Sequence, residues 1–282
     1  MNKNVFFLVF ITTSLLIVLG FAKERTNLEK MNIDDKTAKV VKPRANQRPV
    51  LVELFTSEGC SSCPPADRVI KELANEQPIA NANIIVLSEH VDYWNRLGWQ
   101  DPYSSKEFSL RQNNYAQVFR NDSVYTPQMV INGRYELNGS NKEKALELIS
   151  KSANKPTCQI EVNYQELKRN TLNIDINITD LSILNPTQVN TSNEIILAVA
   201  EDNLSSSVIR GENAGRKLLH TSVVRKLTVL GQINVNKNNS NNYKSSVIID
   251  LSDKWQRDNL KIVVFVQNHI TREVFGVSQI NL

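Results

Sequence analysis

Two cysteines, Cys60 and Cys63, stand in the segment SEGCSSCPPADRV, directly after the apolar run VLVELF. A Cys-x-x-Cys pair can act as a reversible disulfide, supply two ligands of a metal site, or close a small structural bridge. A zinc site needs four ligands, and the only other cysteine, Cys158, lies 95 residues after Cys63. A structural bridge across so short a loop restrains the unfolded chain little. The spacing therefore favours redox chemistry.

The segments around the pair predict an order of strands and helices, β-α-β-α-β-β-α, that begins near Pro49. Asn132 and Gly133 mark a hairpin between the last two of these strands. In chain order, the expected elements are a strand at 49–55, a helix at 64–76, a strand at 83–91, a helix at 104–120, two strands within 127–140 and a helix at 141–152.

The cysteine pair falls where the first strand meets the first helix, which is the thioredoxin-like arrangement. Amide groups at the helix start and the positive end of its dipole are expected to stabilise a thiolate at Cys60, which makes this residue the attacking group. Cys63, one turn later, can resolve a mixed disulfide. Pro64 and Pro65 fit a helix that begins around Cys63, although a start at Cys60 stays open.

Thr126-Pro127 precedes the strand segment QMVING. In a thioredoxin-like fold this position carries a cis-proline loop that faces the cysteine pair, and a cis bond would expose the Thr126 backbone for pairing with a substrate peptide. The alternative is an ordinary proline at the start of a strand. The place of the dipeptide in the predicted order favours the first interpretation.

The segment SEHVDYWNRLGWQDPYS is richer in His, Asp, Trp and Tyr than a connector requires. His90, Asp92 and Trp94 follow the second strand and are expected at the same sheet edge as Cys60, where they could bind substrate. There, His90 or Asp92 could transfer protons or tune the thiolate. The aromatic residues could instead only cap the core. Cys60, Cys63 and His90 would also suit a three-ligand copper site, which is the metal alternative.

From residue 155 to residue 282, alternating segments predict about seven strands and an antiparallel, sandwich-like all-β domain. A short helix is conceivable within GRKLLHTSVVRKL, residues 215–227. The polar segment RGENAGRKLLHTSVVRKL either forms a long loop between strands or reaches across to the cysteine site and shapes a cleft there. Cys158 is expected as a buried free thiol, with exchange with the pair as the alternative.

The N-terminus holds an apolar run from Val5 to Ala22, which predicts a cleaved signal peptide at 1–22 or, if it is retained, a membrane anchor at 5–22. A polar linker is expected at 23–48. The protein is therefore expected to be exported, either periplasmic or secreted, with membrane association through this segment as a further option. A net charge of +4 over 282 residues, without a basic face, argues against a nucleic-acid partner.

Five motifs together resemble domain-of-unknown-function family 1223, a family of exported bacterial thioredoxin-like proteins. They are VELFTSEGCSSCPPAD, HVDYWNRLGWQDPYSS, RQNNYA, VYTPQMVINGR and RGENAGRKLLHTSVVRKL. The resemblance implies a thioredoxin-like domain at 49–154 and a β-rich region at 155–282. It carries a thioredoxin-type role only onto Cys60, Cys63 and Pro127. The segment HVDYWNRLGWQDP lengthens the gap between Cys63 and Pro127, and we expect it to form a lid over the cysteine site.

These observations predict an α/β thioredoxin-like domain followed by an all-β domain in an exported thiol-disulfide oxidoreductase-like protein. Cys60, Cys63 and Pro127 would be catalytic, and Thr126, His90, Asp92 and Trp94 would bind a protein or a small thiol or disulfide substrate. We expect no cofactor and no metal. The alternatives are a binding protein with a structural disulfide and the copper-handling protein.

Overall fold

The computed structural model describes residues 47–184, 192–233 and 241–282. The expected signal or anchor at 1–22, and the expected linker up to residue 46, lie outside the described residues. Within the described ranges, no helix has both the length and the apolar character needed to cross a membrane.

The first half of the described chain has the predicted order of strands and helices. Ser105 caps the second helix by accepting a hydrogen bond from the Glu107 amide, and Asn141 caps the third by accepting one from the Lys144 amide. The elements are β1 (Arg48–Thr56), α1 (Pro64–Glu76), β2 (Ala82–His90), the short 3-10 helix η1 (Asn95–Leu97), α2 (Lys106–Phe119), β3 (Gln128–Ile131), β4 (Tyr135–Asn138) and α3 (Lys142–Ala153).

The second half consists of strands and short 3-10 turns. The helix considered at 215–227 is not formed, because Lys217–His220 and Val223–Ile233 are strands. The elements are β5 (Gln159–Lys168), β6 (Thr171–Thr179), η2 (Leu181–Leu184), β7 (Asn193–Glu201), β8 (Leu204–Ser207), β9 (Lys217–His220), β10 (Val223–Ile233), β11 (Asn242–Asp250), η3 (Arg257–Asn259), β12 (Leu260–Asn268) and β13 (Val274–Asn281).

A mixed sheet of eight strands runs through both halves in the order β13-β12-β7-β10-β2-β1-β3-β4. Strands β1 and β2 are parallel, and β3 and β4 continue the sheet antiparallel. The halves join where β10 pairs with β2 in parallel at Val223 and Ser88, beside a hydrogen bond of 2.8 Å from the Ser88 amide to the Ser222 carbonyl. The fold is therefore mostly β, with a large mixed sheet and few helices.

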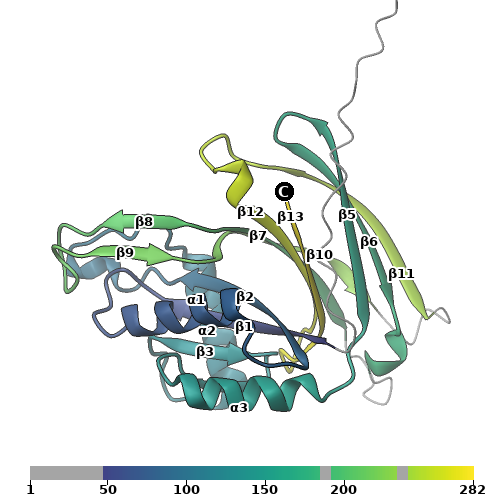
Figure 1. The fold of residues 1–282 in the computed structure, drawn as a ribbon, viewed down its shortest axis with the longest axis horizontal. Coiled ribbons are helices and arrows are strands. Elements are labelled where there is room, and N and C mark those ends of the chain that lie inside the picture. The colour runs from purple at the N-terminus through teal and green to yellow at the C-terminus, as the bar shows by residue number, and fades with distance from the viewer. Residues whose placement is uncertain (1–46, 185–191, 234–240) are drawn as a thin grey trace, which may run out of the picture. The chain divides into compact units, whose positions relative to one another are not determined.

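Helices cover both faces of the first four strands. Helices α1 and α3 pack on one face, in a core built around Val50, Val52 and Leu54 of β1. Helix α2 lies against the other face, where Phe108 packs with Leu51 of β1. The faces alternate along β1 because successive side chains of a strand point to opposite sides. The cysteine turn begins after the carboxyl end of β1, at Thr56, and leads into α1 (Figure 1). The carboxyl end of β2 lies beside it, because β1 and β2 are parallel and Thr56 is opposite His90.

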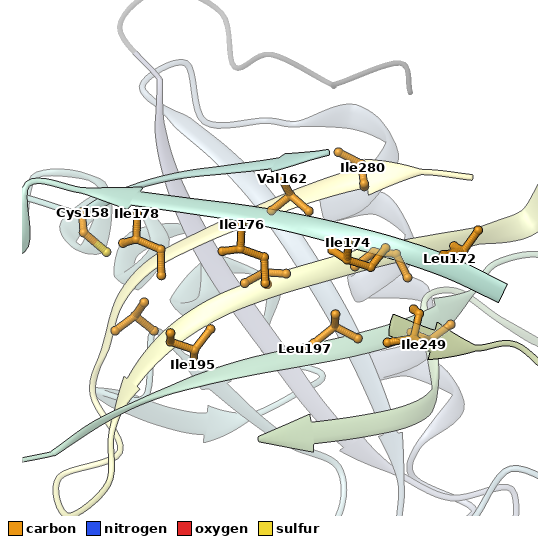
Figure 2. Close-up of a cluster of buried hydrophobic side chains, with 14 of the residues drawn as sticks. Cys158, Val162, Leu172, Ile174, Ile176, Ile178, Ile195, Leu197, Ile249 and Ile280 are labelled. Carbon is orange, nitrogen blue, oxygen red and sulfur yellow. The ribbon is translucent and has the colours of Figure 1, made fainter. Parts of the chain in front are cut away.

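A second sheet of three strands, β11-β6-β5, packs against β12 and β13 (Figure 1). The core between the two sheets consists of aliphatic side chains, with Cys158 at one end and Leu172 toward the other (Figure 2). The sandwich-like packing expected for the C-terminal half is thus present. Its larger sheet, however, is an extension of the sheet that β1 to β4 begin, which the sequence did not predict.

Candidate functional site

The site is built around the turn between β1 and α1. Cys60 and Cys63 form a disulfide with their Cα atoms 5.4 Å apart. Cys63 is the N-cap of α1, and Pro64 and Pro65 occupy its first turn. Proline suits this turn because its first amides have no partner within the helix. Of the two helix starts left open by the sequence, the one around Cys63 is therefore correct.

The amide groups around the helix start are mostly engaged. The Ser61 amide donates to Glu212, the Cys63 amide to the Cys60 carbonyl, and the amides of Ala66 and Asp67 to the Cys63 carbonyl. The two prolines have no N–H group. The expected stabilisation of a Cys60 thiolate by free amides is therefore weaker than the motif alone predicts.

Both sulfur-bearing side chains are shielded, since Cys60 and Cys63 each have 0% of their surface exposed. Only Ser61 and Ser62, between them, are exposed. A partner thiol must reach one of the two sulfur atoms to exchange with the disulfide. Exchange at this site therefore requires a displacement of the residues that cover it.

A loop from the C-terminal half supplies part of this cover. The Asn213 side-chain amide donates hydrogen bonds of 2.9 Å to the carbonyls of both Glu58 and Cys60. The exposed Glu212 accepts a bond of 3.0 Å from the Ser61 amide, and bonds from Ser61 lower the pKa of Glu212. Of the two alternatives that the sequence left open for this polar segment, these contacts agree with the one in which it reaches the cysteine site.

The connector between β2 and α2 covers the same turn from another side. A Cβ atom placed on Gly59 would lie 2.9 Å from Cβ of Trp94, so the two backbones approach closely. Trp99 donates through Nε1 to Oε2 of Glu58 at 2.7 Å. The lid expected from this segment thus contacts the residues just before Cys60.

Thr126 and Pro127 lie beside the cysteine turn. Their peptide bond is cis, and the Ser62 hydroxyl lies 3.5 Å from the Thr126 carbonyl oxygen, to which it donates. Trp94 donates through Nε1 to the Thr126 hydroxyl at 2.8 Å. Two predicted site residues, Thr126 and Trp94, are therefore brought together here.

His90 also lies in this region, buried at the end of β2. Its Nδ1 atom is 2.8 Å from Oδ2 of Asp101, whose carboxylate also accepts bonds from the amides of Glu58 and Tyr103. Burial opposes ionisation of Asp101, but the charge of His90 and these hydrogen bonds outweigh it and lower its pKa to about 2. Burial also opposes a charged His90, yet the Asp101 carboxylate raises the pKa of His90. The arrangement therefore favours the carboxylate form of Asp101 and the imidazolium form of His90.

Two further ionisable residues complete the surroundings. His220 of β9 places Nε2 at 2.9 Å from Oε1 of Glu58, and its ring lies 4.8 Å from that of His90, centroid to centroid. Asp67 of α1 accepts a bond of 3.0 Å from the Thr56 hydroxyl, and burial raises its pKa despite the nearby histidines.

The sequence predicted only part of this site. Glu58, Asp67 and Asp101 were not singled out, although an acidic residue four positions after Cys63 on an apolar helix face was a usable signal for Asp67. Asp92 takes a different place, because its carboxylate accepts a bond of 2.5 Å from Ser109 of α2. Asp92 thus fixes the connector to α2.

Within the described ranges, no group of three or more His, Cys, Asp or Glu side chains is arranged to hold a metal ion, so the copper alternative finds no support there. Cys158 is a free, buried thiol, as expected. Burial raises its pKa to about 12, and a Cβ atom on Gly276 would lie 2.5 Å from its sulfur. This close packing assigns Cys158 to the core.

The family described as "Protein of unknown function (DUF1223)" matches residues 51–267. The chain belongs to this family. The match includes the cysteine turn, the connector and the loop with Asn213, so the contacts around the disulfide lie within the DUF1223 region.

Part of the DUF1223 chain is also similar to a thioredoxin from Methanocaldococcus jannaschii. The two are 34% identical over 103 residues, which is 36% of this chain and 94% of the thioredoxin. Among solved structures, the fold resembles a protein from Agrobacterium tumefaciens with a TM-score of 0.60 and 24% identity, over 83% of this chain and 95% of that one. It also resembles HBP35 of Porphyromonas gingivalis, with a TM-score of 0.61 and 14% identity over 83% and 74% of the two chains.

Proposed function

We propose that this protein is an exported thiol-disulfide oxidoreductase whose redox couple is Cys60 and Cys63, carried by a thioredoxin-like domain at 49–154 that is followed by a β-rich domain at 155–282. One observation carries the proposal: the disulfide closes the turn that leads into α1, and Cys63 is the N-cap of this helix. The Thr126 carbonyl lies beside the turn, where it accepts from the Ser62 hydroxyl. The similarity to a thioredoxin supports the proposal.

In the proposed reaction, a thiolate of an external dithiol attacks the sulfur of Cys60. The bond between Cys60 and Cys63 breaks, and Cys63 leaves with the electron pair and takes up a proton. The second thiol of the partner then attacks the mixed disulfide and releases Cys60 together with the oxidised partner. The reverse sequence reduces an external disulfide to a dithiol and re-forms the bond between Cys60 and Cys63. No cofactor is required for either direction.

Several neighbouring residues receive roles in this proposal. Pro127 presents the backbone of Thr126 to an extended substrate, and Trp94 fixes Thr126 through its hydroxyl. His90 tunes the sulfur chemistry through its buried pair with Asp101. The substrate, a protein or a small thiol or disulfide, gains access when the Asn213 and Glu212 contacts release the turn.

Export rests on the N-terminal sequence, whose apolar run from Val5 to Ala22 fits a signal peptide or an anchor. An oxidising compartment outside the cytoplasm also suits a disulfide that must persist between reactions. Signal peptide processing can be checked by N-terminal sequencing of the protein recovered from cells.

A second candidate function is favoured by the burial of the sulfur atoms. With 0% exposure at both cysteines, the bridge could be purely structural and the protein a binding module. A structural disulfide resists the glutathione pool, whereas an exchanging one equilibrates with it.

Graded reduction followed by alkylation separates these functions. The mature protein is equilibrated in glutathione buffers, trapped with an alkylating agent, and the label is counted by mass spectrometry. We expect Cys60 and Cys63 to titrate together at a midpoint within the glutathione range, while Cys158 stays unlabelled and serves as an internal reference. Full resistance of the pair across the range would leave only the structural role.

Single variants then identify the attacking sulfur. Cys63→Ser leaves Cys60 as a free thiol, and Cys60→Ser does the converse. In the native protein at pH 7, we expect Cys60 in the first variant to react faster with iodoacetamide than Cys63 in the second. Equal or reversed rates would contradict the assignment of Cys60 as nucleophile.

A further inference from the structure

Five buried ionisable side chains gather at the carboxyl ends of β1 and β2, and we refer to them as the histidine cluster. They come from four separate parts of the chain: the cysteine turn, helix α1, the β2-α2 connector with the end of β2, and strand β9. The members are Glu58, Asp67, His90, Asp101 and His220. Glu58 lies two residues before Cys60, and the Asp67 amide donates to the Cys63 carbonyl, so the cluster borders the cysteine turn.

The two histidines of the cluster share one bonding pattern. Each has one ring nitrogen on a carboxylate, Nδ1 of His90 on Asp101 and Nε2 of His220 on Glu58. The other nitrogen of each ring, Nε2 of His90 and Nδ1 of His220, is buried and has no hydrogen-bond partner within the described residues. The carboxylate fixes the tautomer, and the second nitrogen can gain or lose a proton without breaking a hydrogen bond.

A buried thiolate at Cys60 would be stabilised by a nearby group that can take up a proton. Both cysteines are buried, so a thiolate formed at Cys60 is an anion away from water and is costly unless a positive charge accompanies it. The amides of the turn are largely engaged by Glu212, Cys60 and Cys63, as described above. His90 pairs with Asp101 of the connector, whereas His220 pairs with Glu58, which belongs to the cysteine turn itself, two residues before Cys60. His220 is therefore the imidazole with the shorter link to this sulfur.

We propose that His220 takes up a proton at Nδ1 when Cys60 is released as a thiolate, and that it thereby keeps this sulfur ionised inside the closed site. This inference rests on the proposed oxidoreductase function. His220 acts through Glu58, which lies two residues before Cys60, and through its charge, so it is a positioning residue for the sulfur chemistry. The C-terminal half thus contributes a functional group to the cysteine site.

The step balances. Reduction of the disulfide by an external dithiol transfers two electrons and releases two protons from that dithiol. One proton is taken up by the Cys63 sulfur and the other by His220, while the Cys60 sulfur keeps a negative charge. The buried region therefore gains one anion and one cation together, and its net charge does not change. This pairing avoids the cost of an isolated buried charge.

Other groups face His220 and compete for the proton. Asp67 on α1 is the main rival, because burial already raises its pKa. The centroid of the Tyr103 ring lies 5.5 Å from that of the His220 ring. The Arg225 guanidinium stacks on the same Tyr103 ring. The charged and titratable groups around His220 are therefore Glu58, Asp67, His90, Asp101, Tyr103 and Arg225.

The test is an NMR titration of the three imidazoles in the oxidised protein and in protein reduced with a phosphine. His269, the third histidine, bonds to Glu194 and is half-exposed, which makes it an internal control. We expect the protonation midpoint of His220 to rise by about one pH unit on reduction, and that of His269 to stay constant. In His220→Gln, which keeps a donor to Glu58, we expect Cys60 alkylation at pH 6.5 to slow about tenfold. His269→Gln should leave it unchanged.

An unchanged His220 midpoint, or a slowing by Asp67→Asn but not by His220→Gln, would overturn the inference. If phosphine reduction needs unfolding conditions, Cys63→Ser supplies a native protein with a free Cys60, and its His220 midpoint must exceed that of oxidised wild type. The experiments distinguish a failure of this inference from a failure of the proposed oxidoreductase function. A pair that equilibrates with glutathione without moving His220 refutes only this inference. A pair that moves His220 yet resists glutathione refutes only the oxidoreductase.

Discussion

Two buried charged clusters lie on opposite faces of the same pair of strands. Glu89 and His90 are neighbours at the end of β2, and strand alternation sends their side chains to opposite sides. On the face toward α1, His90 joins the histidine cluster. On the face toward α2, Glu89 joins what we call the arginine cluster, which consists of Glu53, Glu89, Arg111, Tyr115 and Gln267.

The two clusters differ in their basic residues: one contains an arginine and the other contains two histidines. Arg111 keeps its proton throughout the physiological pH range, and Glu53 raises its pKa further against the effect of burial. Its guanidinium donates to Glu53 at 2.7 Å and to Gln267 at 3.0 Å, so it joins α2 to β1 and β12. The histidine cluster has imidazoles with a free nitrogen instead. The comparison teaches that the cation on one face of the sheet stays charged at physiological pH, whereas the bases on the other face are imidazoles, a group whose charge depends on pH.

The largest effect is expected at the arginine cluster. Arg111→Met removes the only cation beside Glu53 and Glu89 among the described residues, and leaves a buried carboxylate unpaired. We expect a loss of roughly 3–5 kcal/mol in the free energy of unfolding, measured by urea denaturation at pH 7. The control is Arg68→Met on the exposed face of α1, which should change stability by less than about 0.5 kcal/mol. A loss below about 1 kcal/mol at Arg111 would end the view that this cluster is held by its fixed charge.

The histidine cluster should show a smaller effect that depends on pH. The pKa of Asp101 is lowered to about 2 in the folded protein, below its usual value, so its contribution is complete above the unfolded value and disappears as the pH falls through about 2. Asp101→Asn is therefore expected to cost about 2 kcal/mol at pH 7 and progressively less below pH 4. Urea unfolding of both proteins at several pH values measures this. A cost that stays constant with pH would contradict the ion pair with His90.

The smallest effect is expected at Glu89. Burial raises its pKa well above the ordinary value, which favours the neutral carboxyl in the folded protein. Glu89→Gln resembles that neutral form and should cost less than about 1 kcal/mol. Glu53→Gln is the matched change, and it should cost more because Glu53 accepts from both Arg111 and Tyr115. Equal costs at the two positions would mean that the cluster does not distinguish its two carboxyls.

Much of the fold was predictable where signals are local. Apolar periodicity indicated β1, α1 and β2, and Asn132-Gly133 marked the β3-β4 hairpin, which the structure contains. The continuity of the large sheet was not predictable, because β2 and β10 meet at one residue pair, Ser88 and Val223, that lie far apart in the sequence. So short a pairing leaves no periodic pattern in either segment.

The site was predictable to a similar extent. The spacing of Cys60 and Cys63 indicated the turn, whereas the composition of the segment with Asn213 left open whether it reaches the cysteine site. The pairing of His90 with Asp101, and of His220 with Glu58, depends on how the connector and β9 fold back onto the turn. No local pattern reports such a meeting, because each partner is an ordinary polar residue in its own segment.

The shared sheet limits what can be cut from this protein. Leu51, Ile85 and Leu87 pack in one core with Ile196 and Phe265, which belong to the C-terminal strands. A fragment that ends at Asn154 would therefore expose an apolar sheet face and the unpaired edge of β2 to water. Such surfaces promote self-association. The thioredoxin-sized portion is thus expected to aggregate when it is expressed by itself.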